Sequence, residues 1–343
     1  MPAVSVVVPV YNMKNYLQRC VDGLLQQTLS DLQIILMDDG SNDGSGVMCD
    51  DLALLYGNVE SYHQKNAGLT AAWKAGSSYA KGEYIGYVDA DDYIDRDMFQ
   101  RLYERAKETD ADMVCCGLEH LYEEDPEKSW TEESTLSEDT YDEEGIKGLL
   151  SGSLINDGSF MGRPLLVNRV TKLVKRELVL QNMSLCADAV SIGEDVQFTL
   201  AMLTGAKKLA LIKDYYPYHY YMQPSSMTMH YDAAYMDKIN TMRRNLIRIA
   251  RDSGYPAIEQ QIWNDFLCLT VMHVKAIVCK QKKTPYATVR KEMEKVLRSR
   301  SVMWALGHAK MPRLALSVRL FLELMKWEWY PVMYLIIRVW FKE

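Results

Sequence analysis

The sequence predicts an α/β protein built on a doubly wound, mostly parallel sheet. Short apolar segments rich in β-branched residues, such as residues 4–8, alternate with longer segments whose apolar residues recur at helical spacing. Polar clusters follow four of the predicted strands, which is where doubly wound sheets bind ligands. A mostly helical region is expected to begin near residue 232.

The individual elements follow from their patterns. Continuous apolar runs predict buried strands at residues 4–8, 32–37, 59–64, 83–89 and 113–122. Amphipathic spacing predicts helices at residues 13–28, 43–56, 68–80 and 193–206, with another beginning near Asp142. The strongly acidic residues 119–144, which include Pro126, are expected to form an exposed loop. The sequence "KKTP" at residues 282–285 predicts a break among the C-terminal helices.

Composition is typical of a globular protein. Of the 343 residues, 48% are hydrophobic and 25% charged. The first apolar run lacks the basic lead and the cleavage site of a signal peptide, so none is expected. The seven cysteines are scattered without a C-x-x-C pair, which argues against a disulfide framework or a zinc site and favours a reducing cytoplasm.

Charge is distributed unevenly along the chain. Residues 238–343 hold 20 Lys and Arg against 8 Asp and Glu, whereas residues 1–237 hold 19 against 38. The basic part is suited to an anionic surface, and ordinary solvated helices are the alternative. The acidic front would repel nucleic acid, so no nucleic-acid partner is expected.

The C-terminal stretch, residues 313–343, is the most apolar part of the chain. Charged residues interrupt it too often for a membrane span, which needs about 18 or more uncharged residues. Its dense aromatic and basic residues favour a helix lying in the membrane interface. Packing on the body of the protein is the alternative interpretation.

The sequence "YVDADDYID", residues 87–95, follows the fourth predicted strand. On an extended chain the carboxylates of Asp89 and Asp91 point the same way. Oxygen ligands of this kind select Mg²⁺ or Mn²⁺, which are usually held by one or two carboxylates together with substrate phosphates.

Five motifs occur in an order and spacing that resemble family 2 glycosyltransferases: "VSVVVPVYN", "MDDGSNDGS", "NAGLTAAWKAG", "GEYIGYVDADDYI" and "GEDVQF". The resemblance covers roughly residues 1–225 and is specific as a set. It implies the GT-A fold, a nucleotide-diphosphate sugar as donor and transfer with inversion. The expected domains are residues 1–225, divided into a nucleotide-sugar part (1–112) and an acceptor part (113–225), and a helical region, 226–343.

The resemblance also assigns residue roles on the donor side. Asp39, with Asp38 beside it, would accept the uracil N–H, which favours a UDP-sugar. The nucleoside would be flanked by residues of two turns: Pro9, Tyr11, Asn12, Asn66 and Gly68. Asp89 would face the ribose and the metal, with Ala90 next to it, and Asp91 would bind the metal.

Inverting transfer needs a base for the acceptor hydroxyl. The resemblance places that base at Asp195, and Glu194 is the close rival; a helix N-terminus favours ionised carboxylates at both. Charge complementarity with the helix is the alternative. His219 is a further candidate for the metal or the diphosphate, with an ordinary packed histidine as the alternative, and Lys172 for the acceptor or a phosphate.

The chain departs from the family pattern at three places. Trp73-Lys74 stand where Arg-Asn is usual, and Thr171 replaces the usual Asn before the Lys-Leu pair. Met222-Gln223 occupy the region where an Arg is common. These departures leave the donor sugar open.

We therefore expect a cytoplasmic, peripheral membrane glycosyltransferase of the hexosyltransferase type. It would use a metal ion and an Asp base to move a sugar from UDP to a hydroxyl of a growing or lipid-linked glycan. The alternatives are a catalytically silent nucleotide-sugar-binding or membrane-recruitment module, and a sugar-phosphate nucleotidyltransferase, although the latter's Gly-rich phosphate loop is absent after the first strand. The sugar, acceptor, linkage and oligomeric state are not predicted.

Overall fold

The computed structural model describes residues 1–122, 125–222, 232–280 and 284–340. The chain forms two compact units. Unit 1 comprises Met1–Gly148 and Leu165–Ser225, and unit 2 comprises Leu149–Pro164 and Ser226–Glu343. Residues 149–164, which the sequence analysis placed in the glycosyltransferase domain, thus group with the helical part.

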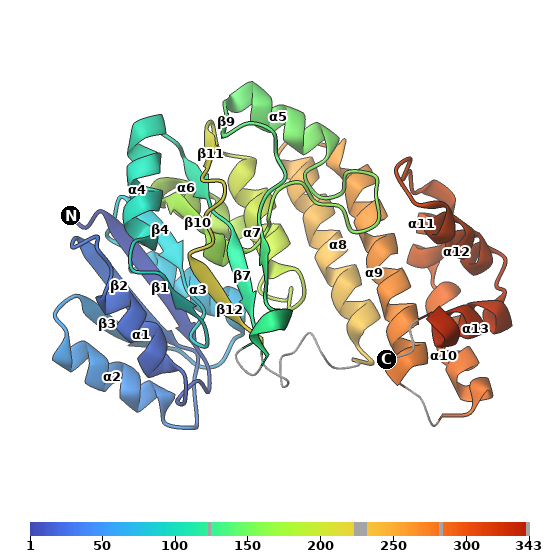
Figure 1. Cartoon of the computed structure of the whole chain (residues 1–343), viewed down its shortest axis with the longest axis horizontal. Coiled ribbons are helices and arrows are strands. Elements are labelled where there is room, and N and C mark those ends of the chain that lie inside the picture. Colours follow the sequence, from blue (N-terminus) through green and yellow to red (C-terminus); the bar gives the residue numbers. More distant parts are fainter. Residues whose placement is uncertain (123–124, 223–231, 281–283, 341–343) are drawn as a thin grey trace. The chain divides into compact units, whose positions relative to one another are not determined.

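Unit 1 is built on an eight-stranded sheet with the order β3-β2-β1-β4-β10-β6-β11-β9 (Figure 1). The first four strands of this order are parallel, and β10 runs antiparallel to both of its neighbours. This confirms the predicted α/β fold with a mostly parallel sheet. The strands are β1 (Val4–Val10), β2 (Leu32–Asp38), β3 (Val59–His63), β4 (Tyr84–Tyr87), β6 (Met113–Cys115), β9 (Thr140–Tyr141), β10 (Lys172–Lys175) and β11 (Leu209–Leu211).

Helices cover both faces of this sheet because successive strand residues point to opposite sides. Val6 and Val8 of β1 belong to the core cluster that contains apolar residues of the first helix. Val7 points the other way, where its Cγ1 would lie 2.5 Å from a Cβ added at Gly76. Gly76 therefore lets α3 approach the sheet closely. The helices are α1 (Leu17–Leu25), α2 (Ser45–Leu55), α3 (Leu69–Ser78), α4 (Met98–Thr109), α6 (Arg176–Asn182) and α7 (Glu194–Leu203), with α5 (Glu143–Gly152) reaching the first unit boundary.

A second sheet of unit 1 was not anticipated. It has the order β5-β12-β7-β8 and comprises β5 (Tyr93–Ile94), β7 (Leu118–Leu121), β8 (Trp130–Glu132) and β12 (Tyr218–Tyr221). The strand predicted at residues 113–122 divides into β6 and β7, one for each sheet. A Cβ at Gly117 would lie 2.6 Å from Tyr216 Cδ1, so a glycine is needed where the chain passes between the sheets. The loop predicted at residues 119–144 is also wrong in part, since β8 and β9 lie within it.

Register places the ends of the parallel strands at one edge of the main sheet. Val10 pairs with Asp38, and Asp38 pairs in turn with His63. On the other side of β1, Val7 pairs with Tyr87. The segments that follow β1, β2, β3 and β4 therefore emerge together, and they carry the polar clusters of the sequence.

Unit 2 is helical (Figure 1). Its helix α9 contacts α8, α10, α11 and α13. The helices are α8 (Tyr235–Asp252), α9 (Ile258–Lys280), α10 (Tyr286–Leu297), α11 (Arg300–His308), α12 (Leu316–Lys326) and α13 (Tyr330–Trp340).

Helix α9 is the one described helix that is long and apolar enough to cross a membrane, over Ile258–Cys279, and 61% of an apolar 18-residue part of it is buried. Its polar side chains are paired within unit 2. Gln261 accepts from the backbone N–H of Ile155 (2.8 Å) and donates to the carbonyl of Leu150 (2.9 Å). Buried Asp265 forms an ion pair with Arg163. These contacts give α9 the role of a core helix that orders residues 149–164.

The C-terminal stretch forms two helices, α12 and α13, rather than one. Its inward residues are almost fully buried: Met325, Tyr330, Met333 and Ile337. Large apolar side chains nevertheless stay exposed along the same stretch: Leu316, Leu320, Trp327, Trp329, Leu335 and Val339. The stretch therefore combines packed residues with exposed apolar residues on its solvent side.

Candidate functional site

The acidic turn after β2 is held together by backbone hydrogen bonds. Asp43 accepts from the backbone N–H groups of Ser45 (2.9 Å) and Lys14 (3.1 Å). Asp38 accepts from the N–H of Ser41 (3.1 Å) and contacts Nδ1 of His63 (3.1 Å). The Asp38 carboxylate thus faces the neighbouring strand β3. The predicted role of Asp38 beside the nucleotide is therefore not supported. Adjacent residues of an extended chain point to opposite sides, which is why Asp38 and Asp39 differ.

Asp39 organises the turn that follows β3. Its Oδ1 accepts from Gln64 Nε2 (2.7 Å) and the N–H of Ala67 (2.8 Å), and its Oδ2 from the N–H of Gly68 (2.9 Å). The carboxylate is buried, yet Oδ2 accepts only this one bond from described residues, and a carboxylate oxygen can accept two. Asp39 can therefore order the turn and still receive one N–H from a ligand.

Two residues with a positive φ angle, Gly40 and Asn12, bring the turns together. Gly40 has φ +74°, and a Cβ there would lie 2.8 Å from the backbone nitrogen of Asn66, so only glycine fits. Asn12 adopts φ 56°, and its side chain accepts from the N–H of Asn42 (2.9 Å). Pro9 is buried within β1, whereas Tyr11 and Asn66 are exposed at the same strand edge.

The turn after β4 holds three aspartates with different surroundings. Asp92 is buried and accepts from Tyr218 OH (2.6 Å) and the N–H of Tyr221 (2.8 Å), which ties the turn to β12. Asp91 is partly exposed, and no ion pair among the described residues includes its carboxylate. Ala90, which lies between Asp91 and the third aspartate, Asp89, is buried. Asp92 is thus structural, while Asp91 remains available to a ligand.

Arg169 joins the turn after β4 to the start of α7. Its Nη2 lies 3.1 Å from Asp89 Oδ1, and its Nη1 lies 3.7 Å from Asp195 Oδ1. The same Asp195 oxygen accepts from the backbone N–H of Arg169 (3.0 Å). The Arg169 side chain is 1% exposed, whereas those of Asp89 and Asp195 are 31% and 29% exposed. Asp89 and Asp195 can therefore contact a ligand, while the buried Arg169 side chain holds the two carboxylates in place.

The electrostatics of this cluster show an excess of negative charge. Burial raises the pKa of Asp89 to about 6, with the charges of Asp91 and Asp195 adding to the effect and Arg169 opposing it. Burial also raises the pKa of Asp91, and burial together with Asp91 and Asp89 raises that of Asp92. For Arg169, burial lowers the pKa but the carboxylates of Asp89 and Asp195 raise it more. A further cation beside Asp91 and Asp89 would relieve this repulsion.

The residues fit a metal that is held partly by its substrate. Among the described residues, no group of three or more His, Cys, Asp or Glu side chains forms a complete metal cage. Mg²⁺ is usually bound by one or two carboxylates together with substrate phosphates, so a complete protein cage is not required. The unpaired carboxylate of Asp91, next to Asp89, fits that arrangement.

Asp195 and Glu194 begin α7 side by side. Asp195 is anchored by Arg169, as described above. Glu194 is partly buried, and burial, reinforced by the charge of Asp195, raises its pKa to about 7. The structure brings both candidate bases to the Arg169 cluster, and a pKa near neutrality is suited to a general base.

Two predicted site residues lie elsewhere. Lys172 is fully buried, and its Nζ donates to the carbonyls of Leu166 and Asn168, both at 2.7 Å. The prediction that it reaches an acceptor or phosphate is therefore corrected: Lys172 holds the backbone that leads to Arg169. His219 has Glu119 at Nδ1 (2.7 Å) and Asp95 at Nε2 (3.0 Å). Because a metal needs a free ring nitrogen, the metal role predicted for His219 is not supported here.

The departures from the family pattern also have structural explanations. Trp73 is completely buried and packs edge-on against Tyr87 and Phe198. The guanidinium of Arg169 lies 5.9 Å from the Trp73 ring and 5.3 Å from that of Tyr87. Lys74 instead binds Asp188 (2.7 Å). Gln223 lies outside the described residues.

Comparisons with known proteins identify the class. Glycosyl transferase family 2 matches residues 5–166. The cholesterol galactosyltransferase of Borreliella burgdorferi is 31% identical over 248 residues, which make up 71% of this chain and 68% of that protein. The uncharacterized glycosyltransferase EpsJ of Bacillus subtilis is 29% identical over 331 residues, 95% of this chain and 93% of that protein. The chain therefore belongs to glycosyl transferase family 2 and is a glycosyltransferase.

Solved structures agree on the fold. Residues 1–349 of S. aureus TarS superpose with a TM-score of 0.67 at 16% identity, covering 99% of this chain and 91% of that one. TarS has also been solved with UDP-GlcNAc. The mannosyltransferase PcManGT of Pyrobaculum calidifontis, solved with GDP-Man and Mn²⁺, gives a TM-score of 0.51 at 14% identity, with coverages of 100% and 88%. These likenesses confirm the GT-A type of fold.

We predict that Glu194→Gln changes the pH dependence of stability. Burial raises the pKa of Glu194 from 4.5 to about 7, so between these values the folded chain holds more protons than the unfolded chain. This group therefore makes the free energy of unfolding fall as the pH rises through that window. The variant should gain up to about 3 kcal/mol relative to the unsubstituted protein between about pH 4 and about pH 8, measured by urea denaturation.

Glu177→Gln is the matched control, because Glu177 is an exposed carboxylate at the start of α6. Its unfolding free energy should follow that of the unsubstituted protein at both pH values. A Glu194→Gln variant that behaves like this control would contradict the raised pKa.

Proposed function

We propose that the enzyme transfers a sugar from a UDP-sugar to an acceptor hydroxyl, with inversion at the anomeric carbon. One observation carries this proposal. Arg169 binds Asp89, on the turn suited to a metal and diphosphate, and also Asp195, the candidate base on α7. The groups needed by the leaving diphosphate and by the attacking hydroxyl are thus held by one buried side chain.

The donor would lie across the strand ends of β1 to β4. The free acceptor site on Asp39 Oδ2 is suited to the ring N–H of uracil. Asp91 and Asp89 would hold Mn²⁺ or Mg²⁺, which when bound neutralises charge on the diphosphate leaving group. The structures of TarS with UDP-GlcNAc and of PcManGT with GDP-Man and Mn²⁺ support a nucleotide-sugar donor and a metal for this fold.

The base would be Asp195, with Glu194 as the rival. A carboxylate at this position takes the proton of the acceptor hydroxyl as the oxygen attacks the anomeric carbon. Arg169 fixes Oδ1 of Asp195 through its backbone N–H, which leaves Oδ2 to receive the proton. The hydrogen bond thereby sets the direction from which the hydroxyl approaches.

Arg169 would also replace the arginine that the family usually has at position 73. Trp73 supplies an aromatic face there, and Arg169 lies against that face from a different segment of the chain. Its Nε and Nη1 are buried without a hydrogen-bond partner among the described residues. The positive charge near the donor is thus kept although the motif has changed.

The acceptor proposed is a growing or lipid-linked glycan presented at a membrane. Relatives named cholesterol galactosyltransferase and chondroitin synthase support an acceptor that contains a lipid or is polymeric. The exposed apolar residues of α12, α13 and the turn between them, where Trp327 is 70% and Trp329 57% exposed, are suited to the interface of an anionic membrane on the cytoplasmic side. Membership of family 2 removes the nucleotidyltransferase alternative.

For the metal, Asp91→Asn is expected to abolish the increase in UDP affinity that Mn²⁺ produces, because the amide removes a charged ligand. Loss of even an indirect metal contact weakens binding about 10–100-fold, so the effect should be at least about tenfold. Calorimetry of UDP binding with and without Mn²⁺ measures it. Asp31→Asn, which removes an exposed carboxylate from the same unit, should bind UDP normally. Equal affinities for the two variants would exclude Asp91 as a ligand.

For the base, Asp195→Asn should lower turnover by about 10²–10⁴-fold, because it keeps the shape of the side chain but removes its basicity. UDP-sugar affinity should change little. Glu194→Gln should keep most of the activity. Single-turnover rates and donor binding, measured on both variants, give the comparison. The opposite ranking would move the base to Glu194.

For the membrane, the double substitution Trp327→Ser and Trp329→Ser should reduce flotation with anionic liposomes most clearly at high salt. Each basic residue near an anionic membrane contributes about 1 kcal/mol to binding, and salt screens this attraction. Salt does not screen the contribution of indole rings inserted into the membrane. Removing residues 313–343 would also remove the buried Met333 and Ile337 and expose the residues that they pack against, so point substitutions are the cleaner test. Trp130→Ser, at an exposed tryptophan of unit 1, is the control. If the unsubstituted protein does not float with the liposomes, the proposed membrane contact of the exposed apolar residues is wrong.

A further inference from the structure

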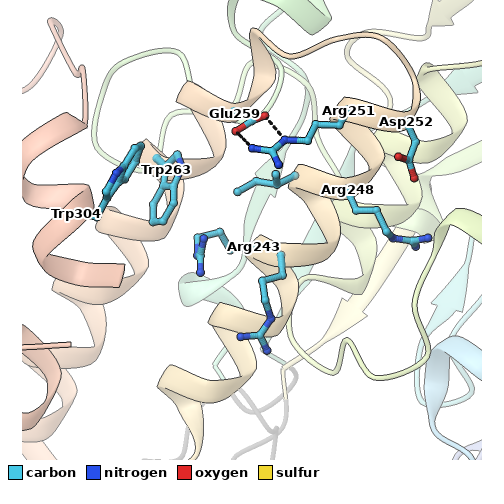
Figure 2. A pocket seen from close by; sticks show the side chains of 9 residues that line it. Arg243, Arg248, Arg251, Asp252, Glu259, Trp263 and Trp304 are labelled. Atoms are coloured by element: carbon cyan, nitrogen blue, oxygen red, sulfur yellow. Dashed lines mark hydrogen bonds and ion pairs between the residues drawn. The ribbon is translucent and has the colours of Figure 1, made fainter. Parts of the chain in front are cut away.

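Arginines that the proposed reaction does not use line a groove of unit 2 between α8, α9 and α11 (Figure 2). There Glu259 binds Arg251, and the rings of Trp263 and Trp304 lie 4.0 Å apart between centroids. The groups that could identify a ligand are thus already in contact with one another. Arg19 of unit 1 is different, because it lies beside the turn that carries the candidate metal ligands.

Helix α1 supports the backbone of the turn after β4. Arg19 Nη2 donates to the backbone carbonyl of Asp91 (2.9 Å). The Sγ of the next residue, Cys20, lies 3.6 Å from the carbonyl oxygen of Asp89. Both contacts are made to main-chain oxygens, so they hold the turn in place while the carboxylate of Asp91 stays available to a ligand.

The guanidinium of Arg19 has no carboxylate partner in the part of the chain that the structure describes, and its side chain is partly exposed. Its charge nevertheless acts on the turn. Burial raises the pKa of Asp91, and the positive charge of Arg19 is one of the effects that oppose this rise. An unpaired cation next to a candidate metal ligand fits a ligand that carries more negative charge than the metal neutralises.

Two tyrosine rings lie against the guanidinium of Arg19. Its Cζ is 5.0 Å from the ring centroid of Tyr93, on β5, and 4.6 Å from that of Tyr221, at the end of β12. Such stacking uses the flat faces of a guanidinium and leaves the N–H groups along its edge free to donate. The Asp91 carbonyl takes one of these donors, and the others have no acceptor among the described residues. Guanidinium edges bind phosphate oxygens in pairs.

We propose that Arg19 binds the diphosphate of the nucleotide-sugar donor beside the metal. The inference rests on the proposed function, since it assumes a nucleotide diphosphate at the strand ends of unit 1. The diphosphate gains negative charge as its bond to the sugar breaks, and a cation already fixed at this position stabilises that charge. The two tyrosines and the Asp91 carbonyl keep the guanidinium in place for this contact.

Binding in the absence of metal separates a direct contact with the diphosphate from mere support of the metal ligand. NMR titrations of the full chain in EDTA would compare UDP with uridine, which lacks the diphosphate. Arg19→Gln should weaken UDP binding at least about tenfold, because charged hydrogen bonds to phosphate are lost, and should leave uridine binding unchanged. Calorimetry with Mn²⁺ should show a loss of UDP affinity in the same variant.

Arg101→Gln is the matched control. Arg101, on α4 of the same unit, also lies over a tyrosine ring, 3.7 Å from the centroid of Tyr215, and its ion pair is with Asp97. This variant should bind UDP and uridine normally. Arg19→Lys keeps the charge but loses the planar edge, so it should weaken UDP binding less than Arg19→Gln does. Circular dichroism checks folding, and Arg19→Lys alone decides the comparison if Arg19→Gln fails to fold.

Three results would overturn the inference. UDP binds the unsubstituted, metal-free protein no more tightly than uridine does; Arg19→Gln weakens UDP binding only when Mn²⁺ is present; or Arg19→Gln weakens the binding of uridine and UDP equally. The second result would make Arg19 a support for Asp91 alone and would leave the proposed reaction intact. Failure of the unsubstituted protein to bind UDP even with Mn²⁺ would contradict the proposed function as well.

Discussion

The geometry of the candidate active site depends on the ion cluster around Arg169. A buried guanidinium requires anions close by, and removing one partner of such a pair is typically destabilising by about 3–5 kcal/mol. Asp89 and Asp195 meet this requirement from segments more than one hundred residues apart in the chain. Lys172 supports the same arrangement from beneath by fixing the carbonyls that precede Arg169. The cluster therefore ties the fold of unit 1 to the spacing between its donor-side and acceptor-side carboxylates.

The features that the sequence predicted well are those governed by local periodicity. Strand β1 is apolar at every position except Ser5 and α1 is amphipathic, so each could be recognised without knowledge of its neighbours. Because parallel strands end at one edge, the convergence of Asn12, Asp39, Gly68 and Asp89 also followed from the chain order. The family resemblance added the roles of these residues, which periodicity alone does not supply.

The features that were missed depend on contacts between distant segments. Arg169 stands in no recognisable motif, and only the folded chain shows that it lies against Trp73, where the family arginine is absent. Lys172 was expected to reach the acceptor or a phosphate because it stands in the Lys-Leu pair of the family pattern, yet two backbone carbonyls satisfy it inside the core. The strands at residues 118–141 are short, and their acidic composition is typical of loops. Their pairing with other strands in the two sheets outweighs this local preference. The signal that could have found Arg169 was its position three residues before Lys172, immediately before the segment in which Thr171 departs from the family pattern.

The second sheet gives the acidic segment between Leu121 and Thr140 an indirect influence on the reaction centre. Strand β8 pairs with β7, β7 with β12, and β12 carries Tyr218, whose hydroxyl binds Asp92 beside the candidate metal ligand. A small shift of the outer hairpin would therefore be transmitted along main-chain ladders to the aspartates after β4. Sequence drift in this segment can act as a fine adjustment of catalysis, so that related enzymes could diverge in rate or preference while every residue that touches the substrate stays the same.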